Sequence, residues 1–275
     1  MTAQPAVFPP AHPSPRPPAP PTLASRHRTL TAGGMLTLVY GMIAYASFLV
    51  TIVYAIGFVG NWAVPKSIDS GAAGPILPSL IINALLLSLF VVQHTVMARP
   101  AFKRWWTTII PKAIERSTYV LAASASLLLL FWLWRPLPQV VWSVQSSPLY
   151  WALAAVSLTG WAIVFLSSFM VSHFDLFGLR QTWLRFRERA YAPVGFRLIG
   201  LYKLIRHPLM AGFLIAFWAT PVMTAGHLFF AVMVTGYIFF GTHMEERDLV
   251  AEHGESYLEY RRRVPGFIPV PRRGS

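Results

Sequence analysis

Four apolar runs, each long enough to cross a membrane, constrain the fold of this chain more than any other feature. They cover about 35–59, 76–97, 117–134 and 148–171. A helix rises about 1.5 Å per residue, so roughly 20 apolar residues cross a hydrocarbon core of about 30 Å. Only 12% of the residues are charged, which is about half the fraction found in soluble domains. The sequence therefore predicts an integral membrane protein built from helices.

A fifth apolar block, at 208–244, is too long for a single crossing. Pro221 and Gly226 interrupt it near the middle. We expect two short helices, about 209–222 and 227–244, that form a hairpin, each slightly short of a full crossing. The predicted fold is an all-α polytopic membrane helix bundle. It has four spans, a C-terminal helical hairpin (five to six membrane helices in all) and a short cytosolic C-terminal helix.

The chain divides into four predicted parts. Residues 1–34 are rich in proline and are expected to form a disordered cytosolic tail. Residues 35–171 form the four-helix transmembrane region, and residues 172–207 a basic cytosolic loop. Residues 208–275 contain the hairpin and a C-terminal segment that is expected to bind a cofactor.

The distribution of charge predicts the orientation in the membrane. The net charge is +13, and 21 of the 23 basic residues fall on the side that holds both termini, leaving Lys66 and Arg135 opposite. Because loops rich in Lys and Arg stay in the cytosol, both termini are expected to be cytosolic, in a bacterial inner membrane. The same bias explains the charge without a nucleic-acid partner. The absence of cysteine excludes disulfides and thiolate metal sites, and no metal site is predicted.

The sequence R-H-P at 206–208 lies at the start of the hairpin. Pro208 suits the first position of a helix because it lacks a backbone N–H that would have no partner there. The next amide groups, from Leu209 onward, then point toward the cytosol, where the helix dipole favours an anion. Together with Arg206 and His207 at the cap, they predict an anion-binding site.

Acidic residues gather at the other end of the hairpin. Six of the ten carboxylates lie in 245–259, beginning with Glu245 and Glu246. Because a hairpin returns to the face that it left, these carboxylates are expected beside His207. One rim then offers an anion site next to a cation site, which fits an amino acid or S-adenosyl-L-methionine. The structural alternative is that the carboxylates pair with Arg247 and with the arginines at 261–263.

Short motifs carry a family resemblance. R-H-P at 206–208, E-E at 245–246 and G-E-S-Y-L-E-Y-R-R-R-V-P-G-F-I-P at 254–269 resemble the membrane methyltransferases of the isoprenylcysteine carboxyl and phospholipid N-methyltransferase type. Q-H-T-V-M-A-R-P at 93–100 and E-R-S-T-Y-V at 115–120 more specifically resemble methanethiol S-methyltransferases, in the broader NnrU-like group. The resemblance implies S-adenosyl-L-methionine as cofactor and a small thiol as substrate, with methanethiol converted to dimethyl sulfide at the cytosolic membrane face.

The resemblance also assigns roles to individual residues. It implies that His207 and the neighbouring backbone hold the carboxylate of the cofactor, and that Glu245 or Glu246 meets its ammonium. Tyr257 and Tyr260 would form a wall for the adenosine. The C-terminal part of the chain is thus the expected cofactor site.

Two features limit how such a cofactor can bind. The chain contains no GxG sequence, so a soluble Rossmann-type cofactor domain is not expected, and binding would take place at the membrane surface. The family pattern is R-H-P-x-Y, whereas this chain has Met210 at the tyrosine position. A hydroxyl role at this position is therefore absent, although a thioether can pack against a purine.

Two histidines are candidates for binding or activating the thiol substrate. A thiol attacks well only as a thiolate, so a nearby cation and a neutral histidine would assist. His94 lies near the cytosolic end of the second span and His173 just past the fourth. We expect His173 to be the base or to orient the substrate, with Arg180 as electrostatic help and His94 as the second catalytic candidate.

Three alternatives remain open from the sequence. His94 and His173 are also placed to act as axial ligands of a haem b, as in a membrane isomerase of the NnrU-like type. In the second alternative, the chain is a methyltransferase of the same type whose acceptor is a prenylcysteine or a membrane lipid. A non-enzymatic accessory or transport protein would bind no adenosyl cofactor.

Overall fold

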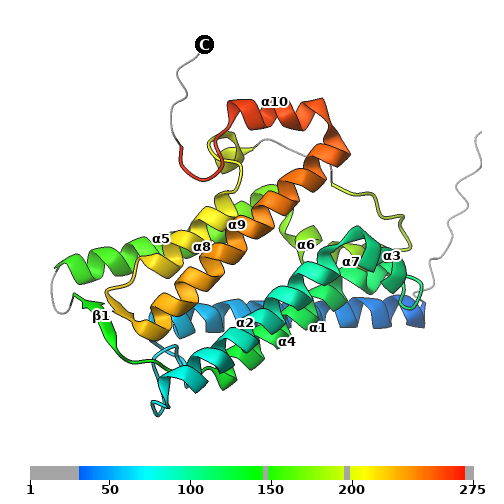
Figure 1. Ribbon diagram of the computed structural model, residues 1–275. Helices are drawn as coiled ribbons and strands as arrows, with labels where there is room; N and C mark the ends of the chain where they lie inside the picture. The colour runs from blue at the N-terminus through cyan, green and yellow to red at the C-terminus, as the bar shows by residue number, and fades with distance from the viewer. Residues whose placement is uncertain (1–30, 145–147, 195–198, 270–275) are drawn as a thin grey trace, which may run out of the picture.

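The computed structural model describes residues 31–144, 148–194 and 199–269 (Figure 1). Within these residues helices predominate, and the predicted all-α polytopic bundle is confirmed. Five of the described helices are long and apolar enough to cross a membrane, so the chain is an integral membrane protein. They are α1 (Ala32–Gly60), α2 (Ile76–Ala98), α4 (Lys112–Leu133), α5 (Pro148–Val171) and α9 (Ala225–His253). Most of the predicted tail, residues 1–30, lies outside the described residues.

The hairpin differs from its prediction in the lengths of its two helices. The first, α8 (Pro208–Trp218), has only 11 residues, whereas α9 has 29. The prediction that both helices are short is wrong for α9, because the polar residues after Met244 continue the helix. Between the two helices, β2 (Val222–Thr224) pairs antiparallel with β1 (Val140–Ser143). The sequence break at Pro221 is therefore followed by a strand.

Short helices lie outside the spans, at the end of the bundle where α9 finishes (Figure 1). They are α3 (Pro100–Trp106), α6 (His173–Leu176), α7 (Leu179–Phe186), the 3-10 helix η1 (Gly200–Lys203) and α10 (Glu255–Arg263). The segment 172–207, predicted to be a loop, thus contains three of them. Thr182 of α7 is fully buried against Gly41 of α1, so this segment packs onto the bundle.

The spanning helices form two groups, seen side by side in Figure 1. In the first, α1 and α2 pack on α4; in the second, α5 and α9 pack on α8. The α5–α8 contact is very close, because a Cβ at Gly160 would lie 2.6 Å from the carbonyl oxygen of Gly212. Away from the short helices, buried aromatic side chains fill the space between the groups. They include Phe58, Phe131, Trp134, Phe217 and Phe230.

Candidate active site

The two ends of the hairpin meet through an ion pair. The Nε of Arg206 donates to Oε1 of Glu246 at 2.8 Å, and Nη2 lies 2.8 Å from the same oxygen. The Nη1 of Arg206 donates to the carbonyl oxygens of Arg261 and Val264. Arg206 therefore ties together the segment before α8, the helix α9 and the end of α10.

His207 joins the same cluster. Its Nε2 lies 2.9 Å from Oε1 of Glu246, and its Nδ1 lies 3.9 Å from Oε2 of Glu245. Its backbone N–H donates to the carbonyl oxygen of Gly266 at 3.0 Å, and its ring lies 5.5 Å from that of Phe267. We call Arg206, His207 and Glu246 the clamp. The sequence predicted this meeting of residues from the two ends of the hairpin.

The neighbouring carboxylates differ in how fully they are paired. The Nε of Arg261 also lies 3.5 Å from Oε2 of Glu246, and only 14% of the Glu246 side chain is exposed. The side chain of Glu245 is 54% exposed, and its contact with His207 is a long one. Asp248 pairs with Arg99 at 3.0 Å. Of this acidic group, Glu245 thus keeps the most capacity to bind a further cation.

Two tyrosines of α10 lie close to the clamp. Tyr257 and Tyr260 are both buried, with ring centroids 5.8 Å apart. The hydroxyl of Tyr260 donates to the carbonyl oxygen of Tyr202 at 2.8 Å. Burial raises the pKa of Tyr257 and of Tyr260 to about 12, so both are neutral phenols at physiological pH.

An apolar chamber lies between the two helix groups and reaches the start of α8, next to the clamp. Its volume is about 340 Å³, and all five long helices and α8 contribute to its wall. Leu209 and Met210, which directly follow Pro208, line it. The cap residue His207 makes no side-chain hydrogen bond to the first turn of α8, which leaves amide groups there available for a ligand. The clamp and the chamber therefore adjoin the same helix start.

The chamber has one polar end. The hydroxyl of Tyr119 lies 2.8 Å from Nε2 of His94 and 3.0 Å from Nδ1. The guanidinium of Arg116 lies over the Tyr119 ring, 4.9 Å from its centroid. All three residues line the chamber. The sequence predicted His94 as a candidate but missed Arg116 and Tyr119, although both lie in the motif E-R-S-T-Y-V.

His173, the other histidine candidate, lies behind the chamber wall. Within the described part of the chain it does not line the chamber, whereas its partner Ser168 does. Its Nδ1 lies 2.8 Å from Oγ of Ser168, and its Nε2 lies 2.9 Å from the hydroxyl of Tyr45. The ring stacks on Phe169 with centroids 4.1 Å apart. Burial lowers the pKa of His173, so its imidazole is neutral at physiological pH.

Arg180, the predicted electrostatic helper, already has a counter-ion. Its Nη1 lies 2.9 Å from Oδ1 of Asp175. Asp175 also accepts a hydrogen bond from the Tyr191 hydroxyl at 3.1 Å, and the Arg180 guanidinium lies over the Tyr191 ring. Among the described residues, Arg180 is not part of the chamber wall. The structure thus brings His94, but neither His173 nor Arg180, to the chamber.

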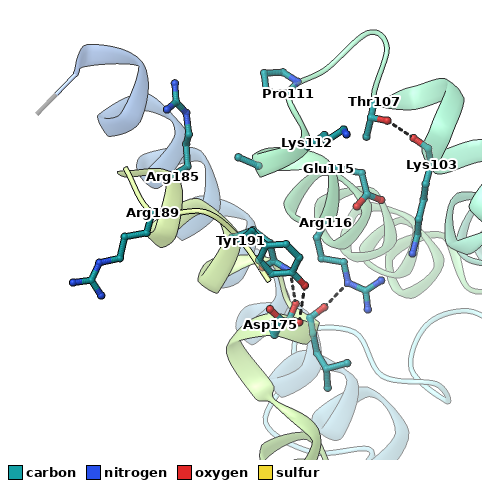
Figure 2. Close-up of a pocket in the computed structure, with 13 residues that line it drawn as sticks. Lys103, Thr107, Pro111, Lys112, Glu115, Arg116, Asp175, Arg185, Arg189 and Tyr191 are labelled. Carbon is teal, nitrogen blue, oxygen red and sulfur yellow. Dashed lines mark hydrogen bonds between the residues drawn. The ribbon is translucent and has the colours of Figure 1, made fainter. Parts of the chain in front are cut away.

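A second, larger cavity opens beside the chamber among α3, α4, α6 and α7 (Figure 2). Its volume is about 750 Å³, and we call it the basic cavity. Its acidic residues are Glu115 and Asp175. Its basic residues are Lys103, Lys112, Arg116, Arg185 and Arg189. Arg116 and Leu176 line both cavities, so they form the partition between them.

Comparison with known proteins finds named relatives. The chain is 55% identical over 232 residues to methanethiol S-methyltransferase 2 of Bradyrhizobium diazoefficiens, covering 84% of this chain and 89% of the relative. It is 52% identical over 238 residues to the methanethiol S-methyltransferase of Mycobacterium tuberculosis, covering 86% and 98%. A nurim homologue of Drosophila pseudoobscura pseudoobscura is more distant, at 30% over 191 residues, covering 67% and 74%.

No family model and no solved structure matches the chain. The bacterial relatives nevertheless share about half of all aligned residues over most of both chains. They confirm the resemblance carried by the motifs in 93–100 and 115–120. The chain belongs to the methanethiol S-methyltransferase family.

Proposed function

We propose that this protein transfers a methyl group from S-adenosyl-L-methionine to methanethiol, producing dimethyl sulfide. The names of its relatives support the substrate and the reaction. The observation that carries the proposal is the position of the apolar chamber, whose wall includes Leu209 and Met210 directly after the clamp. A small, apolar thiol fits such a chamber, and a charged cofactor fits the start of α8 and Glu245, beside the clamp.

The cofactor's zwitterionic end has a matching set of groups. The uncapped start of α8, at Pro208 and Leu209, is suited to the carboxylate, with His207 beside it. Glu245 is suited to the ammonium because its charge is only weakly paired. Arg206 and Glu246 are engaged with each other, so we assign them to holding this site together.

The aromatic part of the cofactor has a candidate wall in Tyr257 and Tyr260. Both are buried, neutral phenols beside the clamp. Met210 takes the place of the tyrosine found in the wider family pattern, and it lines the chamber. We therefore assign Met210 to packing against the methyl-bearing end of the cofactor.

The bound cofactor supplies an electrophilic methyl group on a sulfonium sulfur. The chain must hold the thiol sulfur about 3 to 3.5 Å from that methyl, in line with the bond that breaks, and exclude water. The apolar wall of the chamber excludes water. The His94–Tyr119 pair, at 2.8 Å, is placed to take the thiol proton.

We further propose that the protein lies in a bacterial inner membrane with both termini and the clamp on the cytosolic side. The support is the asymmetry of charge, with 23 basic residues of which only Lys66 and Arg135 fall on the opposite side. In this orientation the segment 208–275 presents the cofactor site to the cytosol.

The haem alternative has little geometric support. Both ring nitrogens of His173 already lie within hydrogen-bond distance of hydroxyls, those of Ser168 and Tyr45. His94 lines the chamber and His173 does not. An axial pair would need free nitrogens facing one space. A Soret band in the purified protein would contradict this conclusion.

The test is expression in a host that forms no dimethyl sulfide, followed by headspace analysis after addition of methanethiol. Dimethyl sulfide is expected only in cells that carry the protein. Calorimetry with S-adenosylhomocysteine tests the cofactor site separately, and His207→Ala is expected to abolish this binding. Methylation of a prenylcysteine or a phospholipid, with no dimethyl sulfide formed, would contradict the assignment of the acceptor.

A further inference from the structure

Of the two described residues that line both the chamber and the basic cavity, Arg116 is the charged one, and Leu176 is the other. Arg116 is the only charged side chain that lines the chamber in the described part of the protein. It also lines the basic cavity, where a dashed line in Figure 2 marks the hydrogen bond from its guanidinium to Leu176 of α6. A single guanidinium therefore lies between an apolar space and a polar one.

The contacts of Arg116 hold it in place without cancelling its charge. Its Nε donates to the carbonyl oxygen of Leu176 at 2.7 Å, and its guanidinium lies over the Tyr119 ring. Among the described residues no carboxylate lies within ion-pair distance of Arg116, whereas Arg180 is paired with Asp175 at 2.9 Å. Arg116 therefore has a charge available for a ligand in the chamber.

Other charges near Arg116 leave a positive excess. Lys103 of α3 extends toward Arg116 in Figure 2, with Glu115 close to both. Burial lowers the pKa of Lys103, and the charge of Arg116 lowers it further while that of Glu115 raises it. The basic cavity also holds Lys112, two further arginines and one further carboxylate, Asp175. The field at the polar end of the chamber thus favours an anion.

The anion that this place suits is a thiolate. A thiol is a strong nucleophile only after it loses its proton, and an apolar chamber by itself opposes that loss. An opposite charge within about 4 to 6 Å lowers such a pKa by about 1 to 3 units. We propose that Arg116 binds the acceptor sulfur and stabilises it as a thiolate, which makes Arg116 a catalytic residue. This inference rests on the proposed function.

The resulting step balances in atoms and charge. The thiol proton passes to the His94–Tyr119 pair, which lies beside Arg116 in the chamber wall. The thiolate lone pair forms the new bond from sulfur to the methyl carbon, and the bond from that carbon to the sulfonium sulfur breaks. One anion and one cation become two neutral sulfides, so the attraction of Arg116 for the acceptor ends with the reaction and the product is free to leave.

The test compares Arg116→Gln and Arg116→Lys with a series of thiols of increasing acidity. For methanethiol, Arg116→Gln is expected to lower kcat/KM about 10- to 1000-fold, as a pKa change of about 1 to 3 units implies. The loss is expected to shrink steadily as the thiol becomes more acidic, and Arg116→Lys is expected to recover part of it. An equal loss for every thiol would assign Arg116 a structural role only and overturn the proposal.

A second readout does not depend on turnover. Benzenethiol bound together with S-adenosylhomocysteine reports its own ionisation by ultraviolet absorbance, because its thiolate and thiol absorb differently. The apparent pKa of the bound thiol is expected to rise by about 1 unit or more in Arg116→Gln. An unchanged pKa, with both ligands bound, would contradict the proposal.

Lys103 provides a test that leaves the Leu176 contact intact. Lys103→Gln removes a charge from the basic cavity and is expected to raise the same pKa by a smaller amount. Arg104→Gln is the matched control, because Arg104 is the exposed neighbour on α3 and is not among the residues that line the cavity. If Arg116→Gln does not fold, equal results for these two variants overturn the proposal. If the wild-type protein forms no dimethyl sulfide, the proposed function itself fails. If the wild type is active but Arg116→Gln loses the same factor in kcat/KM for every thiol, only the role of Arg116 is removed.

Discussion

The clamp and the chamber adjoin the same short helix, α8, but they are built in opposite ways. The clamp consists of charged groups that are paired with one another, and the side chains of Arg206 and Glu246 are only 11% and 14% exposed. The chamber is a space of about 340 Å³ with an apolar wall and one unpaired guanidinium among its described lining residues. A clamp of this kind fixes geometry, whereas an apolar chamber whose wall includes one such charge can accept and activate a ligand.

The difference suggests a division of labour that mutations can test. Changes in the clamp should reduce stability and cofactor binding together, because the same bonds hold three segments of the chain. Changes in the chamber should alter turnover while the fold and cofactor binding remain. Substitution of single residues therefore tests whether each one contributes to the clamp or to the chamber.

Breaking the clamp should have the largest effect. In Glu246→Gln, the side chains of Arg206 and His207 lose their shared anionic partner. Removing one member of a buried ion pair costs about 3 to 5 kcal/mol, so the apparent free energy of unfolding in detergent should fall by at least about 3 kcal/mol. Binding of S-adenosylhomocysteine, measured by calorimetry, should be lost with it.

Asp248→Asn provides the matched control for that experiment. Asp248 lies on the same helix, and its pair with Arg99 is exposed, at 56% and 32% of the two side chains. An exposed pair contributes less than about 1 kcal/mol. Similar losses of stability in the two variants would show that the clamp is no stronger than a surface ion pair.

Removing His94, the proposed general base in the chamber wall, should reduce turnover nearly as much as breaking the clamp does. It should leave the binding of S-adenosylhomocysteine intact. His94→Gln replaces the ring beside the Tyr119 hydroxyl, and the loss of a general base typically lowers kcat about 100- to 10,000-fold. His173→Gln, behind the wall, should be much milder. Rates from headspace analysis and binding of S-adenosylhomocysteine should be compared in both variants. A larger loss of kcat in His173→Gln would return the catalytic role to His173, as the sequence first suggested.

A smaller effect should separate the two adjacent glutamates. Glu245 has one long contact, 3.9 Å to His207, and is half exposed, so Glu245→Gln should change the free energy of unfolding by less than about 0.5 kcal/mol. A hydrogen bond to a charged group contributes about 1.5 to 3 kcal/mol. Affinity for S-adenosylhomocysteine should therefore fall about 10- to 100-fold. Unchanged affinity would remove Glu245 from the cofactor site.

The sequence predicted the spans and the clamp well, because both follow from strong local signals. The runs at 76–97 and 148–171 match α2 and α5 within one residue at each end. The clamp followed from two charged motifs and the rule that a hairpin returns to its starting face. The extension of α9 beyond Met244 was missed, because apolar periodicity ends there while the helix continues through charged residues.

The chamber was not predictable in the same way. Its wall draws on helices from both groups, so its position depends on how the groups pack, which no local pattern encodes. In the sequence Arg116 is a charged residue near the start of a helix, which is typical of a surface position. Its contact with Leu176 of α6 is a tertiary one, so its place in the chamber wall could not be predicted from the local sequence. Arg180 seemed equally suitable in the sequence, but Asp175 lies five positions before it and neutralises it.

The smallest expected effect concerns pH and tests whether His173 is structural. Burial lowers the pKa of its imidazole below the ordinary value of 6.5, so protonation favours the unfolded chain. The stability that depends on neutral His173 is complete above that ordinary value, and it is lost as pH falls toward the lower pKa of the folded protein. His173→Gln removes the titration and can still hydrogen-bond to Ser168 and Tyr45. Apparent free energies of unfolding, measured in detergent across this range, should therefore converge for wild type and variant as pH falls. Parallel curves would mean that His173 does not titrate with unfolding, and its place behind the chamber wall would then have no consequence for stability.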